Sequence, residues 1–363
     1  MTPSEQTAIQ AEAARLLQRF EAAGAAPVEA AILQPAEVLL DLYGEDIRAR
    51  AYVTSDALRG EQMLRPDFTV PVVQMHMAHG AEPACYTYAG PVFRRQEEDA
   101  ARASEYTQVG FEVFDRTNPA AADARVFALF HEVLAPLKLR AATGDIGILM
   151  AAVDGLQTTD RRKSALRRHI WRPRRFRALL DRFSGRSPVP KAREALLAAQ
   201  DPMAEAGPAI GLRSASDVRA RIDVLLEDAA TPPIAQEEVT LIDALLAVRE
   251  TSDNALERLR DISVDMPALV PAVSCLSKRL DAFMSQGIDI TTLDFETSYG
   301  RTQMEYYDGF VFGFYVDGRA DLPPVASGGR YDALTRHLGG GAEIPAVGGV
   351  IRPELALKIG AAA

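Results

Sequence analysis

Apolar side chains along this chain follow two periods, that of a helix and that of a strand. Near the N-terminus they recur every three to four residues, which predicts an amphipathic helix over residues 4–22. Ser4 and Thr7 do not make the pattern of a capping box, so the sequence leaves the start of this helix open. Strand-like runs and one short helix follow, the strands around residues 28–33, 47–54 and 63–64 and the helix over 37–43.

Two longer strand signals lie between Tyr88 and Phe114, where apolar residues alternate with others in two runs joined by a charged loop. The first strand delivers Arg94 at its end. On the second, Gln108 and Glu112 are four positions apart and therefore face the same side of the sheet. A cation that faces an amide and a carboxylate is suited to a zwitterion, because the cation binds the ligand carboxylate while the acid binds its ammonium. The segment therefore predicts a site for a zwitterion.

The middle of the chain has a different character from both ends. From about residue 156 to residue 285, strand signals vanish and apolar stripes at helical spacing replace them. Outside it the sequence predicts helices after Pro71 and Asn118 and strands at 145–147, 310–316, 325–327 and 346–351. We therefore predict an α+β fold, a mainly antiparallel sheet flanked by helices. Residues 1–155 and 286–363 would form one core, and residues 156–285 an inserted helical domain.

Composition narrows the class of protein. The 363 residues are 48% apolar and 25% charged, as in ordinary globular domains. A net charge of −10 argues against a general binder of polyanions, whose phosphate contacts need clustered cations. Cys85 and Cys275 lack the spacing of a metal or redox motif and are expected to be structural thiols. The N-terminus lacks a signal-peptide pattern and no apolar run approaches the roughly 20 residues of a bilayer span, so a cytoplasmic protein is expected.

Residues 88–114 closely resemble motif 2 of the class II aminoacyl-tRNA synthetases, and specifically that of histidyl-tRNA synthetase. In that family the arginine of the motif holds the amino-acid carboxylate and the ATP α-phosphate. The resemblance therefore implies a histidine-binding role for Arg94, Gln108 and Glu112. The structural alternative is an Arg94–Glu112 pair that only neutralises a buried face of the sheet.

Two more segments resemble the histidine pocket of this family. Around Asp67 and Thr69 the chain is similar to the segment in which an acid and a threonine hold the α-amino group, although the family's glutamate is an aspartate here. Tyr306 and Tyr307 align with the paired tyrosines of a histidine-specific motif, which implies that they line the imidazole pocket. The structural alternatives are a proline turn that caps a helix and a pair of aromatic core residues.

Residues 326–334 match a second histidine-specific motif almost residue for residue, which implies that Gly328, Gly329 and Arg330 belong to the pocket wall. The glycines permit a close approach of the backbone. The alternative for Arg330 and Asp332 is that they only brace the turn through hydrogen bonds. The sequence leaves both interpretations open.

Three departures from the synthetases concern the reaction itself. The family's catalytic arginine falls on Thr302, with Arg301 one position early and expected to face the opposite way. The motif 3 arginine that binds the ATP γ-phosphate falls on Leu355, and a motif glycine becomes Arg352. The chain also stops at Ala363, where synthetases continue into the domain that binds the tRNA anticodon. The resemblance therefore implies a retained amino-acid pocket without catalytic residues, cofactor, metal or tRNA.

Within this family the chain is similar to the synthetase-like regulatory subunits of ATP phosphoribosyltransferase. The resemblance covers roughly residues 10–150 and 290–357. It implies a non-catalytic subunit that binds L-histidine, self-associates through the synthetase-like core and joins the short catalytic subunit, with no tRNA and no membrane as partner. Two alternative functions stay open. One is an ATP-dependent amino-acid ligase that acts on a non-tRNA acceptor, and the other is an assembly scaffold whose pocket binds no ligand.

One basic segment lies outside these regions of resemblance. Arginines are dense from Arg161 to Arg186, and we expect Asp181 alone to offset them. One interpretation is a solvated helix face. The other is a surface for an anionic partner or a nucleotide, since concentrated charge steers association.

Overall fold

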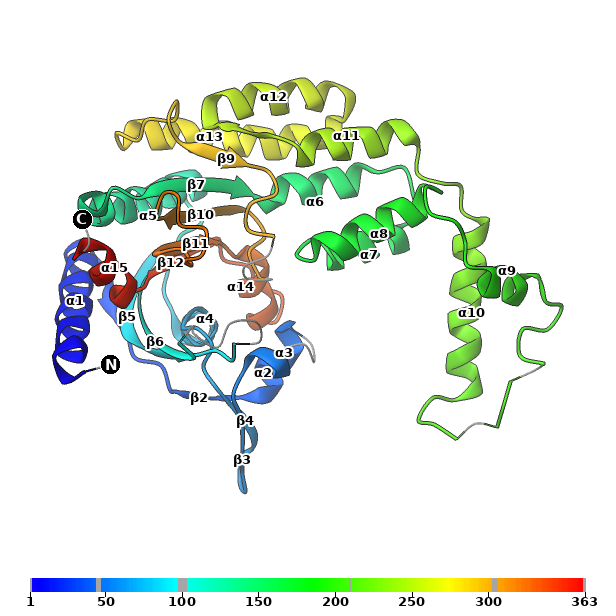
Figure 1. Cartoon of the computed structure of the whole chain (residues 1–363), viewed down its shortest axis with the longest axis horizontal. Coiled ribbons are helices and arrows are strands. Elements are labelled where there is room, and N and C mark those ends of the chain that lie inside the picture. The colour runs from blue at the N-terminus through cyan, green and yellow to red at the C-terminus, as the bar shows by residue number, and fades with distance from the viewer. Residues whose placement is uncertain are drawn as a thin grey trace.

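The computed structural model describes residues 2–43, 47–96, 103–204, 206–208, 210–301 and 306–361. Its main sheet has nine strands in the order β1-β5-β6-β12-β11-β10-β7-β9-β8. Neighbouring strands are antiparallel, apart from the parallel pairs β1–β5 and β7–β9. Helices flank this sheet (Figure 1). The predicted α+β class, with a mainly antiparallel sheet between helices, is confirmed.

The centre of the sheet combines strands from both ends of the chain. β5 (Ala84–Phe93) and β6 (Glu105–Phe114) form the predicted pair as an antiparallel hairpin. The other edge of β6 pairs with β12 (Ala346–Ile351), which is followed by β11 (Ala326–Arg330) and β10 (Phe310–Tyr315). Residues that are far apart in the sequence therefore meet on one face of this sheet.

Shorter strands complete the two sheets. The main sheet also contains β1 (Ala26–Pro27), β7 (Arg140–Asp145), β8 (Arg249–Thr251) and β9 (Asp294–Glu296). A second sheet consists of β2 (Leu33–Pro35), β3 (Val53–Asp56) and β4 (Gly60–Leu64). Figure 1 shows the β3–β4 hairpin projecting from the body of the molecule.

Three of the strand predictions are wrong in type or position. The run from 47 to 54 begins as a short helix, α3 (Ile47–Arg50). The run over 28–33 lies between two short strands, since β1 ends before it and β2 starts at its last residue. Asp145 ends β7, and its carboxylate accepts a hydrogen bond from the Gly147 N–H at 2.8 Å as the N-cap of α6 (Ile146–Gly155). A capped start favours a helix, so the apolar run after Asp145 continues as α6.

The first helix, α1 (Pro3–Ala22), starts with a capping box that the sequence analysis overlooked. The Thr2 hydroxyl accepts a hydrogen bond from the Glu5 N–H at 3.3 Å, and the Glu5 carboxylate accepts one from the Thr2 N–H at 2.6 Å. The buried face of α1 lies on the sheet, where the Phe20 ring is 5.4 Å from that of Phe111 on β6. The Thr-Pro-Ser-Glu sequence contained the signal for this start.

The helix α5 (Pro119–Leu134) lies between the sheet and α13 (Val270–Ser285). The centroid of the Phe127 ring is 5.7 Å from that of Phe312 on β10 and 4.9 Å from that of Phe283 on α13. Aromatic pairs at these separations bury much apolar area. The last helix of the segment 156–285 is therefore packed onto the core.

The remaining helices fall into two groups. Those near the sheet are α2 (Ala36–Tyr43), α4 (Thr69–His79), α14 (Asp332–Leu338) and α15 (Pro353–Gly360). Those of the middle segment are α7 (Asp160–Arg168), α8 (Pro173–Phe183), α9 (Lys191–Ala198), α10 (Ala215–Ala230), α11 (Gln236–Leu246) and α12 (Ser252–Asp265). Figure 1 shows α9 and α10 projecting away from the sheet. Within these two described helices, Ile222 is the buried side chain.

Candidate functional site

Glu112 lies at the centre of a buried polar site on β6. Its side chain is completely buried. Gly348 on β12 is its partner in the strand register. A Cβ atom on Gly348 would lie 1.5 Å from Glu112 Oε2, so a glycine is needed here to leave room for the carboxylate.

Three hydroxyl groups from different elements donate hydrogen bonds to this carboxylate. Thr69, the first residue of α4, donates to Oε1 at 3.0 Å, and Tyr88 on β5 donates to the same atom at 2.7 Å. Tyr331, directly after β11, donates to Oε2 at 2.6 Å. Tyr88 and Tyr331 were not predicted as site residues, although both lie inside motifs that the sequence shares with the synthetases. The three-dimensional pairing of β5, β6, β12 and β11 is what brings their hydroxyl groups to Glu112.

Burial dominates the electrostatics of Glu112. It raises the pKa of Glu112 from 4.5 to about 7, although the three hydroxyl groups stabilise the charged form. The pKa values of Tyr88 and Tyr331 lie well above the ordinary value, because both phenols are buried beside this carboxylate. Both tyrosines therefore remain hydrogen-bond donors, while Glu112 is close to its titration point at neutral pH.

Two further buried acceptors belong to residues of the predicted site. Asp67, in the turn before α4, accepts a hydrogen bond from the Val70 N–H at 3.3 Å through Oδ1, while Oδ2 has no partner among the described residues. The amide oxygen of Gln108 on β6 is likewise buried without a described partner. Burial raises the pKa of Asp67, and the nearby charge of Arg94 opposes that rise. Because buried polar groups normally have partners, these two oxygens favour a ligand that donates hydrogen bonds.

Arg94 follows β5 and lies beside this turn. Its Nε donates a hydrogen bond to the carbonyl oxygen of Pro66 at 2.7 Å. The described contacts of Glu112 are with hydroxyl groups, and none joins it to Arg94. The described part of the chain therefore gives no support to the alternative in which these two residues simply neutralise each other.

The paired tyrosines lie between Glu112 and the middle segment. Both are buried, and their ring centroids are 4.9 Å apart. Tyr306 faces Tyr331 at 6.1 Å, while Tyr307 lies against Gly329, where an added Cβ would be 2.8 Å from its ring. Burial raises the pKa of Tyr307, so its phenol is protonated at neutral pH. The structure thus brings both tyrosines next to the partners of Glu112.

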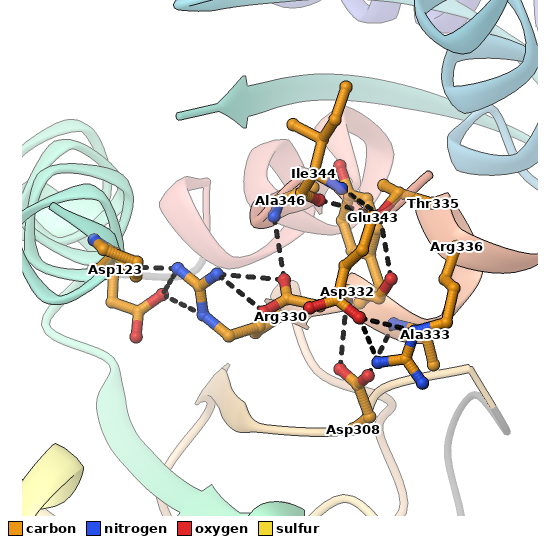
Figure 2. A network of polar contacts seen from close by, with 12 residues as sticks. Asp123, Asp308, Arg330, Asp332, Ala333, Thr335, Arg336, Glu343, Ile344 and Ala346 are labelled. Carbon is orange, nitrogen blue, oxygen red and sulfur yellow. Dashed lines mark hydrogen bonds and ion pairs between the residues drawn. The ribbon is translucent and has the colours of Figure 1, made fainter. Parts of the chain in front are cut away.

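The predicted wall residues have different surroundings. Gly329 is in contact with Tyr307, whereas Gly328 lies against the Gly348 carbonyl and the ring of Phe312 inside the sheet. Arg330 is buried and turns away to a polar network that Figure 2 shows. Gly329 therefore lies beside a predicted ligand residue, and Gly328 contacts sheet residues.

The network around Arg330 joins several elements. Arg330 donates to Asp123 of α5 through Nη2 at 2.7 Å and to Asp332 through Nη1 at 2.9 Å (Figure 2). Asp332 also accepts from the Ala346 N–H at 2.8 Å. Asp308 accepts from the N–H groups of Asp332 and Ala333 at 3.0 and 2.6 Å. These are the bracing hydrogen bonds of the second interpretation of this motif, and they fix the turn that contains Tyr331.

A second arginine extends this network to the middle segment. Arg279 of α13 donates to Asp123 at 2.8 Å and to Asp145 at 2.8 Å, with all three side chains buried. Asp123 is thus shared by Arg279 and Arg330. Neither Asp123 nor Arg279 was singled out from the sequence, because the bonds between them depend on how α13 lies on α5.

Of the residues at which the chain departs from the synthetase motifs, the structure describes Arg301, Arg352 and Leu355. Thr302 is outside the described residues. Arg301 is buried, and its Nε donates to the carbonyl oxygen of Ile170 at 2.8 Å, which places its side chain against the middle segment. Arg352 lies over the ring of Tyr106 at 5.1 Å, and Leu355 packs against the hydrophobic core.

Neither a metal-binding cluster nor a membrane-spanning helix occurs among the described residues. They contain no cluster of three or more histidine, cysteine or acidic side chains that could hold a metal ion. Within the same residues, no helix combines the length and apolarity that crossing a bilayer requires.

The fold and site together define a class: a class II synthetase-like core in which a buried carboxylate and two acceptors face a predicted amino-acid pocket. Comparison with known proteins agrees with this class. The family model described as histidyl-tRNA synthetase matches residues 1–223 and 215–355. A protein of Agrobacterium fabrum named ATP phosphoribosyltransferase regulatory subunit is 33% identical over 93% of this chain and 93% of its own length. A protein of Brucella anthropi with the same name is 30% identical over 88% of this chain and 89% of its own length.

Solved structures show the same fold at lower identity. A Bacillus halodurans protein, described as an ATP phosphoribosyltransferase regulatory subunit/histidyl-tRNA synthetase, has a TM-score of 0.69 and 19% identity, over 99% of this chain and 80% of that one. The histidyl-tRNA synthetase of Nostoc has a TM-score of 0.65 and 18% identity, over 100% of this chain and 74% of that one. The chain belongs to the histidyl-tRNA synthetase-like family and, within it, to the ATP phosphoribosyltransferase regulatory subunits.

Proposed function

We propose that this chain is a non-catalytic, cytoplasmic subunit that binds L-histidine and controls ATP phosphoribosyltransferase activity by feedback at the first step of histidine biosynthesis. It does so by joining the short catalytic subunit and by self-associating through its synthetase-like core, without tRNA, metal or membrane. The names of the relatives support the regulatory role. The chemistry of the pocket supports the ligand.

The observation on which the ligand proposal rests is the surplus of buried acceptors. Asp67 Oδ2 and Gln108 Oε1 have no donor among the described residues, and the donors on Glu112 are all neutral hydroxyl groups. A ligand that brings an ammonium group and a ring N–H would satisfy these acceptors. Histidine contains both groups, and its carboxylate suits Arg94.

Each predicted residue has a role in this proposal. The α-ammonium group lies by Asp67, Thr69 and Gln108, and the carboxylate pairs with Arg94. The imidazole lies between Glu112 and the tyrosines, whose rings form a flat wall. Tyr306, Tyr307, Gly328, Gly329 and Arg330 make up that side of the pocket in this proposal.

A ligand controls a complex only by binding its two states unequally. The bracing network offers a physical connection, because it joins Tyr331, which contacts Glu112, to α13 through Arg330, Asp123 and Arg279. Occupation of the pocket can therefore influence how the middle segment lies on the core.

The test is a calorimetric titration of the chain with L-histidine, alone and in complex with the short catalytic subunit. We expect saturable binding. Arg94→Ala should weaken it by about 10- to 100-fold, since one charge-assisted contact is lost. The matched control is Arg258→Ala, which removes an exposed arginine of α12 without a described partner; its affinity should equal that of the unchanged chain.

Three outcomes would contradict parts of the proposal. Absence of heat with millimolar histidine, both alone and in the complex, would leave an assembly scaffold as the better interpretation. Histidine-dependent exchange of pyrophosphate into ATP would instead indicate a ligase. Equal loss of affinity in both variants would remove Arg94 from the site.

A further inference from the structure

The basic segment from Arg161 to Arg186 divides into a neutralised part and a part with unpaired cations. Acids far from it in the sequence neutralise the first part, so the expectation that Asp181 alone offsets the arginines is wrong. The ion pairs are Arg161–Glu227, Arg162–Asp228, Arg167–Asp154, Arg177–Asp243, Arg182–Asp228 and Arg186–Asp243. These acids come from α6, α10 and α11, which the helical packing brings to α7 and α8.

The unpaired cations include two at the start of α8. Arg174 and Arg175 are exposed and make no ion pair with any described residue. The first turn of α8 has no acid, and the side chain of its N-cap residue does not cap the helix. Residue 173 is a proline without an N–H, so the N–H groups of Arg174 and Arg175 are the free donors at this helix end. A helix N-terminus of this kind attracts anions.

An independent observation concerns Arg301, which contacts the turn before α8 and the first turn of this helix. Arg301 is only 4% exposed, and its guanidinium lies between the Ile170 carbonyl, at 2.8 Å, and the ring of Phe176 in the first turn of α8, at 4.9 Å. Its Nη2 is buried and has no acceptor, and no carboxylate pairs with it among the described residues. Burial, and then the charge of Arg177, lower the Arg301 pKa to about 10, so it remains cationic at neutral pH.

A buried and unneutralised cation is costly unless an anion accompanies it. Here the cation lies against Ile170, before α8, and Phe176, in the same first turn of α8 as Arg174 and Arg175. Guanidinium groups and helix N-terminal amides match the oxygens of a phosphate better than a single carboxylate, because they supply several donors and charges around one group. The nearby acids are already used in ion pairs with other arginines.

We propose that the start of α8 binds the phosphate or diphosphate group of a small molecule through Arg174, Arg175 and their backbone N–H groups, with Arg301 as the cation beneath. This site is separate from the pocket around Glu112. The turn before α8 nevertheless touches the wall of that pocket, since Trp171 Nε1 donates to the carbonyl oxygen of Tyr307 at 3.2 Å. An anion at α8 would therefore order the turn that supports Tyr307.

The test is a calorimetric titration of the full chain with inorganic pyrophosphate at low ionic strength. We expect saturable binding, and a loss of about tenfold or more in affinity for the double variant Arg174→Ala/Arg175→Ala. The matched control is Arg219→Ala/Arg258→Ala, which removes two exposed arginines of α10 and α12. Its affinity should change by less than about twofold.

A third variant, Arg301→Gln, tests the buried cation and should also weaken pyrophosphate binding by about tenfold. If Arg301→Gln does not fold, the double variant decides the question, because its side chains are exposed. No heat with pyrophosphate, or an equal loss in the control, would overturn the proposal. L-Histidine titrated into the double variant separates this site from the proposed function: unchanged histidine binding together with lost pyrophosphate binding supports two sites.

Discussion

At the scale of the residue, the electrostatic balance of Glu112 decides how the site behaves. Its described partners are hydroxyl groups, which stabilise a charge but do not neutralise it. Asp67, which is also buried, adds a further negative charge nearby. The ligand-free site therefore favours a proton on Glu112, and a cationic ligand would favour its release.

The first prediction concerns pH. The Glu112 pKa is raised from 4.5 to about 7 in the folded chain. The corresponding stabilisation of about 3 kcal/mol is complete below the unfolded pKa and is lost as the pH rises through 7. Glu112→Gln removes this contribution, so the free energy of unfolding should fall less between about pH 5.5 and about pH 8.5 than in the unchanged chain. Urea unfolding at the two pH values measures it.

The control for this prediction is a variant of an exposed glutamate, and a second buried acid leaves part of the pH dependence in Glu112→Gln. The exposed Glu250→Gln variant should keep the full dependence on pH. Burial also raises the pKa of Asp308 to about 7, so Glu112→Gln should keep part of the dependence. An identical pH dependence in Glu112→Gln and the unchanged chain would show that Glu112 is not the group responsible.

Sequence reasoning singled out Gln108 and Glu112 but not the side chains that surround Glu112. Gln108 and Glu112 were predictable, because a period of two places residues four apart on one face of a strand. Tyr88 and Tyr331 were not, because their hydroxyl groups reach Glu112 through the pairing of strands that are far apart in the chain. The pairing of Gly348 with Glu112 has the same origin.

At the scale of the element, Asp123 connects α5 to two other elements, β11 and α13. It receives Arg330 from the end of β11 and Arg279 from α13. Four carboxylates and two guanidinium groups make up the network, with Asp145, Asp308 and Asp332 as the other acids. The surplus of acid is consistent with the raised pKa values of Asp308 and Asp332, which have burial as their first cause.

Removal of Asp123 is the prediction at this scale. Asp123→Ala leaves two buried guanidinium groups without their shared partner, and we expect a loss of about 3–5 kcal/mol in the free energy of unfolding. Urea unfolding measures this loss. The control Asp321→Ala breaks an exposed ion pair with Arg319 and should be indistinguishable from the unchanged chain. A loss of similar size in the two variants would show that the network contributes little.

Elements were predictable where one local signal dominates. The β5–β6 pair and α5 appear as expected, since alternation and an asparagine cap are local features. The strand predicted over residues 145–147 was wrong, because β7 ends and α6 is capped at the same residue, Asp145. The three residues of β8 are too few for a periodic signal, and their pairing with β9 comes from the fold.

At the scale of the whole molecule, the division into a core (1–155 and 286–363) and an inserted helical domain (156–285) stays a prediction. Within that middle range, α13 packs on α5 and β8 joins the main sheet, whereas α9 and α10 project from the body (Figure 1). The connection between α9 and α10 contains Ile210 and Leu212, which are 94% and 107% exposed. Exposed connections of this kind are preferred sites of proteolysis.

Limited proteolysis tests this arrangement. We expect the first cut between α9 and α10, because Ile210 and Leu212 in their connection are fully or almost fully exposed. The two products should elute together in size-exclusion chromatography, since β10, β11 and β12 from the second product complete the sheet of the first. Early cuts near residues 155 and 286, with release of the piece between them, would instead indicate an independent domain.

The order of strands in the main sheet also has a consequence for synthesis on the ribosome. β6 is translated well before β12, which pairs with one of its edges. Until then that edge of the nascent sheet has no covering strand, and unpaired edges are prone to aggregation. A product that terminates before Ala346 would lack the strand beside Glu112, so premature termination should yield insoluble protein without the proposed pocket.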